Sequence, residues 1–283
     1  MKYQRAWTAV SACFLAAAAA SPVFAASANA QACSLALTNL QNAEASIRMQ
    51  AADQLAGLAC PDAAAPLLSA LGDSNAAVRG AAARALGLLH DSGALSSLEK
   101  MLASDADGSA RAAAAASLTY LGSRSAEPAL IKALSDSDAA VRYAAVRALS
   151  VLHSPDSVPA MASLLSSGDS GLRRTVAGAL GRIGGAQALA ALKGLLSDPD
   201  SSVRFRAAEA LAFQKDSSGR EVLLNALSSS DAATREQAAN AVALIGTASD
   251  VSALQSALAK EKDPDARAVL SAALKRLLAA TSN

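Results

Sequence analysis

The sequence predicts an all-α protein, an α-solenoid in which about eight two-helix units follow one another. Three observations support this prediction. An arginine recurs at a nearly constant spacing, the apolar residues follow helical periodicity, and aromatic residues make up only 3% of a chain that is 52% apolar and rich in alanine. Alanine favours helices, and a chain with few bulky residues needs closely packed helices to bury enough apolar surface.

The first thirty residues have the features of a secretory signal peptide. A short basic start precedes an apolar run over residues 6–20, and small-residue cleavage sites follow between Ala25 and Ala30. The run is shorter than the roughly 18 residues that a membrane span needs. We therefore expect a signal peptide over residues 1–30, cleaved after Ala30, and a repeat domain over residues 31–283.

Export follows from this prediction, to the periplasm if the source is bacterial, with a secreted or lipid-anchored form as the alternative. The lipoprotein-like stretch that ends at Cys13 comes too early, because much of the apolar run lies after it. The mature chain contains no second hydrophobic span. Loss of Lys2 and Arg5 changes its formal charge from +1 to −1, so nucleic acid, which needs several basic residues on its phosphates, is not an expected partner.

One arginine defines the repeat. Its positions are Arg48, Arg79, Arg111, Arg142, Arg173, Arg204, Arg235 and Arg267. Successive positions are 31 or 32 residues apart, and so regular a register over most of the chain is typical of a repeat array. Below, positions in each unit are counted from this arginine, so that +1 is the residue after it.

Each unit is predicted to contain a short helix followed by a long helix of about four turns that carries the arginine. The residue four positions before the arginine is an expected N-cap, which accepts hydrogen bonds from the free amides of the first turn. These residues are Glu44, Asn75, Asp107, Asp138, Asp169, Asp200, Asp231 and Asp263. Glu44 is not a favoured capping residue, so its cap should be weaker. Position +11 holds Gly122, Gly184 or Gly246 in three units, where the helix should end through a left-handed residue.

The long helices have one apolar side. At 100° per residue, positions −1, +3, +7 and +10 cluster together and are occupied in the fourth unit by Val141, Ala145, Leu149 and Leu152. Positions +4 and +6 are mostly alanine, which lets neighbouring long helices approach. The first set is therefore the predicted core.

The motif D-x-x-V-R-x-x-A-A-x-A-L-G, seen as DPDSSVRFRAAEALA and DSNAAVRGAAARALG, resembles HEAT repeats of the short bacterial type. The resemblance extends from Cys33 to the C-terminus. It implies that the long helices line a concave face and that the aspartate and arginine registers form a hydrogen-bonded ladder between units. Glu44 departs from the aspartate of the motif, so the resemblance does not imply a rung in the first unit.

No catalytic or metal site is expected. His90 and His153 both occupy position +11, and two units apart they would be roughly 20 Å from each other, too far to share a metal, so we expect them to end helices. The HEAT-like deoxyhypusine hydroxylase uses paired His-Glu motifs as iron ligands, whereas these histidines precede Asp91 and Ser154. Because no base for a nucleophile and no phosphate-binding loop remain, the chain is predicted to be no enzyme and to need no cofactor.

The register arginines are expected to serve the scaffold, because most of them follow an aspartate by one helical turn and lie beside the core stripe. Cys33 and Cys60 are the cysteines of the mature chain. Cys33 begins the first short helix and Cys60 follows the first long one, so an antiparallel hairpin would bring them together. A disulfide is therefore predicted in an exported protein, with two free thiols as the alternative.

The variable positions contain the candidate binding site. Positions +1, +5 and +8 point away from the core, with +9 on their flank, and should be exposed along the concave face. All four aromatic residues of the mature chain fall there, with charged residues among them in units three to six. The predicted partner-binding residues are Tyr120, Tyr143, Arg147, Arg174, Arg182, Phe205, Glu209 and Phe213. Exposure is expected above all for Tyr143 and Phe205, since +9 residues could also pack against the adjoining unit.

An exposed row of aromatic residues and arginine has the composition of protein-interface hot spots. The predicted function is therefore an exported, non-catalytic scaffold that binds a protein or peptide on its concave face. Short HEAT-like repeats also resemble bilin lyases, so a lyase or a chromophore- or cofactor-handling assembly factor is the alternative; those proteins act inside the cell, which the signal peptide disfavours. A third alternative is a brace for an envelope assembly without a discrete site.

Overall fold

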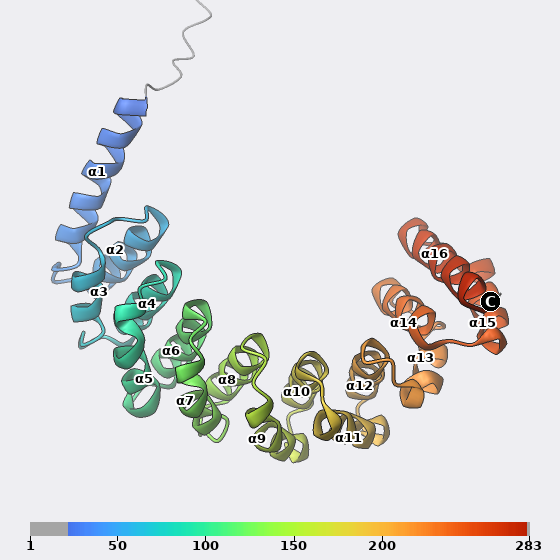
Figure 1. Ribbon diagram of the computed structural model, residues 1–283. Coiled ribbons are helices and arrows are strands. Elements are labelled where there is room, and N and C mark those ends of the chain that lie inside the picture. Colours follow the sequence, from blue (N-terminus) through green and yellow to red (C-terminus); the bar gives the residue numbers. More distant parts are fainter. Residues whose placement is uncertain (1–21, 282–283) are drawn as a thin grey trace, which may run out of the picture.

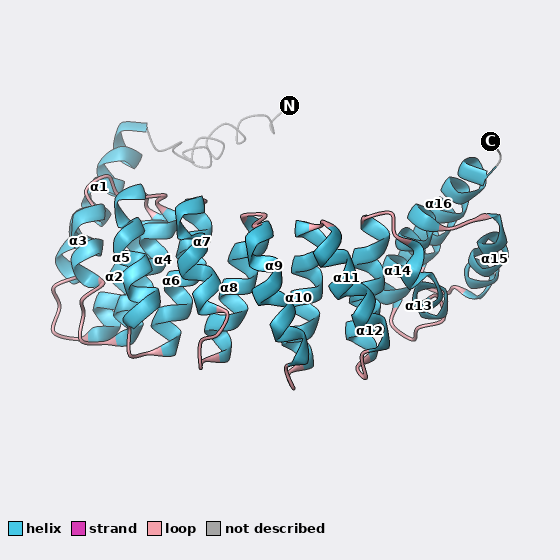
Figure 2. Cartoon of the chain, turned by 60° about the horizontal axis from the view of Figure 1, so that its bottom comes forward, coloured by secondary structure: helices cyan, strands magenta, loops and turns pink. Residues whose placement is uncertain are grey.

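The computed structural model describes residues 22–281, and these form sixteen α-helices in eight sequential pairs with no strand among them. The predicted all-α solenoid of about eight two-helix repeats is confirmed. In Figure 1 the pairs follow one another along an open arc, and one helix of each pair lies on its inner, concave side. Figure 2 shows the same helices side by side, with the loops gathered at the two edges of the arc.

The helices that contain the register arginines form the inner layer. They are α2 (Ala45–Gly57), α4 (Ala76–Leu88), α6 (Gly108–Leu121), α8 (Ala139–Val151), α10 (Ser170–Ile183), α12 (Ser201–Phe213), α14 (Ala232–Ile245) and α16 (Pro264–Thr281). As Figure 1 shows, these helices line the concave side, as the resemblance implied. The predicted core stripe is confirmed, since Val141, Ala145 and Leu149 are fully buried.

The outer layer consists of the first helix of each pair. These are α1 (Pro22–Asn39), α3 (Ala64–Ala70), α5 (Leu95–Ser104), α7 (Glu127–Ala133), α9 (Val158–Ser163), α11 (Ala186–Gly194), α13 (Arg220–Ala226) and α15 (Val251–Lys260). Short 3₁₀ segments precede or follow several of them: Ser92–Ala94, Arg124–Ala126, Pro155–Ser157, Leu164–Ser166, Leu195–Ser197, Ser217–Gly219 and Ala248–Asp250.

The predicted signal peptide falls mostly outside the described residues, which begin at Pro22. Its last part, residues 22–30, is the start of α1, so cleavage after Ala30 would shorten this helix and leave Gln31–Asn39. Within residues 22–281, none of the helices combines the length and the apolar character that crossing a membrane requires.

The N-caps are as predicted. The side chains of Asn75, Asp107, Asp138, Asp169, Asp200 and Asp231 accept hydrogen bonds from first-turn amides of the inner helices. Asp263 does the same for the amides of Asp265 and Ala266, at 3.0 Å each. Glu44 makes no side-chain capping bond, which confirms the weaker cap of the first unit.

Position +11 ends most inner helices at a positive φ even where it is not glycine, although Gly184, with a ψ of −163°, lies outside the predicted left-handed helical region. Positive φ angles occur there at Ala59 (49°), His90 (52°), Gly122 (62°), His153 (50°), Gly184 (71°) and Lys215 (61°). The two histidines therefore end helices, as predicted. The prediction is wrong for Gly246, whose φ is −67°. There the chain continues in extended form into Thr247, which caps the next 3₁₀ segment together with Asp250.

Replacing Ala59 by glycine should raise the stability of the first unit. A left-handed backbone costs an alanine roughly 1 kcal/mol because its Cβ approaches the following carbonyl, and glycine avoids this contact. The greater freedom of glycine in the unfolded chain offsets part of the gain, so the free energy of unfolding should rise by about 0.5 kcal/mol. Urea unfolding followed by circular dichroism measures this change. The same substitution at Ala56, inside α2, should lower the stability instead.

Position +8 is buried in four of the eight inner helices, contrary to the expectation that it faces solvent on the concave side. Gly87, Ser150, Gly181 and Ala212 occupy it in α4, α8, α10 and α12, and each is buried. A Cβ atom added at Gly87 would lie 2.9 Å from Cα of Ser117, and one added at Gly181 would lie 2.5 Å from Cβ of Ala210. The inner helices therefore approach so closely near their C-terminal ends that +8 must be small.

The N-terminal pair of helices is joined by the predicted disulfide. Cys33 in α1 and Cys60 after α2 are bonded, with Cα atoms 5.7 Å apart, and both residues are buried. The bond lies at one end of a core that continues through the array. This core consists of two clusters, one from Cys33 to Leu211 and one from Ala208 to Leu277, which meet at α12.

Candidate functional site

A ladder of ion pairs runs along the edge where the inner helices begin. The register arginine donates from Nε and Nη2 to a carboxylate of the next unit and from Nη1 to backbone oxygens of its own loop. Arg79, for example, lies 2.7 and 2.6 Å from the Asp105 oxygens and 2.9 Å from O of Asp73. The complete rungs are Arg48–Asp73, Arg79–Asp105, Arg111–Asp136, Arg173–Asp198 and Arg235–Glu261.

The carboxylates of the ladder are not those that the resemblance implied. The N-cap aspartates face their own helix, and the rung partner stands two residues before the N-cap, as Asp105 precedes Asp107. Glu44 consequently has no part in the ladder, and the first unit has a complete rung between Arg48 and Asp73. The same carboxylate also accepts a hydrogen bond from the N-cap amide, 2.9 Å in the case of Asp105 and Asp107.

The rungs hold their groups in the charged state. The hydrogen bond from Arg79 lowers the pKa of Asp105, and the bond from Arg235 lowers the pKa of Glu261 to about 2. The same bonds raise the pKa values of the two arginines. Bidentate pairing of this kind fixes both partners, which supports the scaffold role predicted for the register arginines.

Two junctions lack a rung. Serine replaces the carboxylate at position 167, opposite Arg142, and at position 229, opposite Arg204. The corresponding neighbours, α8 with α10 and α12 with α14, pack less extensively than the five other pairs of adjacent inner helices. Less extensive packing of adjacent inner helices therefore coincides with each interruption of the ladder.

A row of exposed residues follows the other edge of the inner layer. Position +9 lies near the C-terminal end of each inner helix, and in units two to six it holds Leu88, Tyr120, Val151, Arg182 and Phe213, here called the +9 row. Its four apolar members are between 51% and 59% exposed. At ~8–10 Å between adjacent helices, the row extends over about 35 Å.

The order of exposure among the aromatic residues is the reverse of the expected one. Tyr120 and Phe213 are exposed, whereas Tyr143 and Phe205 at position +1 are half-buried and pack against the two core clusters. The hydroxyl of Tyr143 donates to Asp169, 3.1 Å from either oxygen. Burial and this bond raise the pKa of Tyr143. At Tyr143 and Phe205, position +1 faces the neighbouring unit and is only partly open to solvent.

The charged candidate residues also differ in their exposure to solvent. Arg147, Arg174 and Arg182 are exposed, and Arg147 and Arg174 both act electrostatically on Tyr143, so both lie near this residue at the junction of units four and five. Arg182 also donates from Nε to the hydroxyl of Ser150 at 2.6 Å. The prediction that Glu209 lies on the exposed face is wrong, since this residue is 7% exposed and forms an ion pair with Arg206.

The structure adds Leu88 and Val151 to the candidate site. Both stand at the position of Tyr120 and Phe213. They were not predicted because the composition of interface hot spots indicates aromatic and charged residues, and these two are aliphatic. The register itself could have found them, since +9 is apolar in four of five consecutive units. The candidate face is therefore the +9 row together with Arg147 and Arg174.

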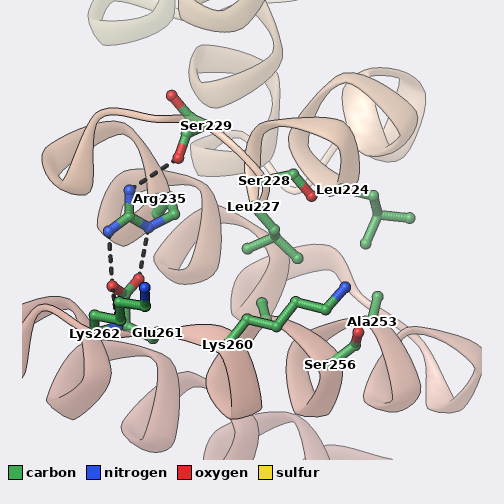
Figure 3. Close-up of a pocket in the computed structure, with 11 residues that line it drawn as sticks. Leu224, Leu227, Ser228, Ser229, Arg235, Ala253, Ser256, Lys260, Glu261 and Lys262 are labelled. Atoms are coloured by element: carbon green, nitrogen blue, oxygen red, sulfur yellow. Dashed lines mark hydrogen bonds and ion pairs between the residues drawn. The ribbon is translucent and has the colours of Figure 1, made fainter.

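Two cavities flank the loop that contains Ser228 and Ser229. One, of about 570 Å³, lies between α13 and α15 and is lined by Leu224, Leu227 and Lys260 among others. Figure 3 shows it beside the complete rung of Arg235 and Glu261. The other, of about 440 Å³, opens at the α12–α14 junction. No group of three or more metal-ligating residues occurs in the part of the chain that the structure describes.

Comparison with known proteins agrees with this architecture. The sequence matches the model of HEAT repeats over residues 34–119, 101–162, 127–212 and 192–275. No curated protein matches it. Among solved structures the chain is similar to YibA of Escherichia coli, with 20% identity and a TM-score of 0.67 over 89% of this chain and 96% of YibA, a similarity of fold.

Two further structures are similar at higher identity. One is the complex of CpcE and CpcF of phycocyanin lyase from Nostoc sp. PCC7120, with 26% identity and a TM-score of 0.53 over 76% of this chain and 94% of that chain. The other is an engineered protein, with 25% identity and a TM-score of 0.54 over 91% of this chain and 82% of that chain. With the repeat model covering most of the residues from 34 to 275, the chain belongs to the HEAT repeat family.

Proposed function

We propose that the chain is an exported scaffold that binds a protein or peptide on its concave face and performs no catalysis. The +9 row supports this proposal most directly. The exposed apolar side chains of units two, three, four and six lie in one row, with the exposed Arg182 of unit five between them, and apolar side chains grouped on a surface in this way mark interaction sites. The basic start and apolar run of residues 1–20 support export.

The composition of the face indicates the kind of partner. Tyr120 and Phe213 offer large amphipathic or apolar side chains, and Arg147, Arg174 and Arg182 place positive charge among them. Aromatic residues and arginine are enriched at interface hot spots because they contribute large contact areas and several hydrogen-bond donors. An extended or helical segment with apolar residues and acidic neighbours would match this surface.

Site-specific photo-crosslinking would test the proposal. A benzophenone amino acid at Val151, in the middle of the +9 row, should crosslink a partner in native envelope extract. Adding Tyr120→Ser and Phe213→Ser should reduce the yield by about tenfold or more, because each hot-spot side chain contributes roughly 2 kcal/mol or more to binding. Circular dichroism should show unchanged helicity, since both side chains are exposed.

A crosslinker at Lys132, an exposed residue of the outer helix α7, is the matched control and should capture nothing specific. Equal capture from Val151 and Lys132, or a yield that the double substitution leaves unchanged, would contradict binding on the concave face.

A second candidate function is a lyase or a chromophore- or cofactor-handling factor. The similarity to the CpcE and CpcF complex of phycocyanin lyase favours it, at 26% identity. The visible absorbance of the purified protein distinguishes the two candidates. A pigment that remains bound through purification would support the second candidate and contradict a pure scaffold.

A further inference from the structure

The α12–α14 junction contains an arginine whose ladder carboxylate is missing. Nη1 of Arg204 donates to the backbone oxygens of Asp198 and Pro199 at 2.7 and 3.0 Å. Arg79, which has a complete rung, is held in the same way by the oxygens of Asp73 and Ser74. Because the backbone anchors are equivalent, Nε and Nη2 of Arg204 are presented toward the next unit as those of Arg79 are.

Ser229 does not replace the missing carboxylate. In complete rungs the carboxylate has two roles, since Asp198 accepts from the N-cap amide of Asp200 at 2.9 Å and from Arg173 at 2.7 and 2.8 Å. Ser229 retains the first role, as its hydroxyl accepts from the amide of Asp231 at 3.2 Å. Among residues 22–281, nothing accepts a hydrogen bond from Nε or Nη2 of Arg204.

The missing rung coincides with a cavity. The space of about 440 Å³ at this junction is lined by both Arg204 and Ser229, with Phe205, Val222 and Ala226 as apolar walls and Asn225 as a further polar group. The junction is also where the two core clusters meet and where inner helices pack least extensively. A cavity of this size has room for a side chain and its flanking backbone.

We propose that this cavity binds the carboxylate of an aspartate or glutamate in an extended segment of a partner protein. The carboxylate would accept hydrogen bonds from Nε and Nη2 of Arg204 in the bidentate geometry of the complete rungs, and the adjoining chain would pack on Phe205. Five rungs of the same chain show that a peptide carboxylate fits this arginine geometry. The site lies at the opposite edge from the +9 row and does not depend on the function proposed for that row.

The internal rungs provide the probe for the test. A labelled peptide acetyl-LSDPD-amide, the sequence of residues 196–200, contains the aspartate that pairs with Arg173. Its binding to the mature protein can be measured by fluorescence anisotropy. Asparagine in place of the first aspartate should weaken binding by about tenfold or more, because hydrogen bonds to a charged acceptor are stronger than those to a neutral amide.

The decisive variant is Ser229→Asp, which supplies the missing carboxylate internally. It should abolish peptide binding and raise the midpoint of urea unfolding, so a loss of binding cannot be attributed to misfolding. Ser167→Asp is the matched control, because it fills the vacancy opposite Arg142 and should leave peptide binding unchanged. Tyr120→Ser with Phe213→Ser should also bind the peptide as the wild type does.

Three results would overturn the proposal. One is equal binding of the aspartate and asparagine peptides, and another is undiminished binding by Ser229→Asp. The third is competition by acetate at the same concentration as unlabelled peptide, which would show that the site takes a free carboxylate and not a peptide segment.

Discussion

Replacing Asp105 by alanine should lower the free energy of unfolding by about 3 kcal/mol, the loss typical when one partner of a buried ion pair is removed. The side chain of Asp105 is 7% exposed and that of Arg79 is 16% exposed, so water replaces the lost carboxylate poorly. The substitution also removes the bond to the amide of Asp107. Since Arg79 keeps its backbone acceptors, the loss should lie near the lower end of the range for buried pairs.

Urea unfolding followed by circular dichroism measures this loss, and Asp53→Ala is the control. Asp53 of α2 pairs with Arg84 of α4 at 3.3 Å on the surface, and both side chains are about half exposed. An exposed pair contributes roughly 0–1 kcal/mol, so the control should change the stability little. Equal losses for the two variants would contradict a structural role of the ladder.

The difference between Asp105→Ala and the wild type should also depend on pH. The hydrogen bond from Arg79 lowers the pKa of Asp105 from its usual 3.8, so the unfolded chain takes up a proton at higher pH than the folded one. The stabilisation is therefore complete above pH values near 3.8 and is lost as the pH falls through the lowered folded value. The two proteins should converge in stability in acid.

Most of the fold could be predicted because the same pattern of helix caps, core residues and helix ends recurs in the eight units of the sequence. The N-cap at Asp138, the core at Val141 and Leu149 and the helix end at His153 recur at fixed positions, so a deviation in one unit does not obscure the pattern. Gly246 shows the limit of this reasoning. Its neighbour Thr247 forms a capping box with Asp250, and this local contact overrides the helix end that the register predicts.

The ladder could not be assigned from the sequence because four of the loops contain two acidic residues that are only two positions apart. The sequence alone does not distinguish the roles of Asp105 and Asp107. Asp105 accepts hydrogen bonds from an arginine of the preceding unit, whereas Asp107 accepts them from the first turn of its own helix. Only the superhelical geometry decides which carboxylate faces the arginine. Once this geometry is known, Ser167 and Ser229 can be recognised as the positions where the ladder lacks its carboxylate.

Exposure at the candidate site depends on the angle at which neighbouring helices meet, which a helical wheel does not contain. A wheel places +1 and +8 on the side away from the core stripe, but the adjoining inner helix covers Gly181 at +8 and half of Tyr143 at +1. Position +9 lies beyond this contact, so Tyr120 and Phe213 stay open to solvent. Glu209 is buried for the same reason, next to Arg206.

Reducing the Cys33–Cys60 bond should destabilise the first unit by about 3.5 kcal/mol, the loop-closure free energy expected for a sequence separation of 27 residues. Within residues 22–281, α1 and α2 have a neighbouring pair on one side only, so the first unit should depend on this bond more than an internal unit would. In a solenoid each unit contacts chiefly its neighbours, so the effect should stay near the N-terminal end.

Hydrogen exchange with and without dithiothreitol measures this effect. Amides of α1 and α2 that exchange through opening of the first unit should do so about two to three orders of magnitude faster after reduction, since each 1.4 kcal/mol corresponds to a factor of ten. Amides of α12 and α14 should be unaffected, because at least nine α-helices lie between these elements and the bonded pair. The double variant Cys33→Ala, Cys60→Ala should show the fast exchange without the reductant and no further change with it. Uniform acceleration along the array would instead mean that the units unfold as one cooperative body, and the ladder would then be the element that couples them.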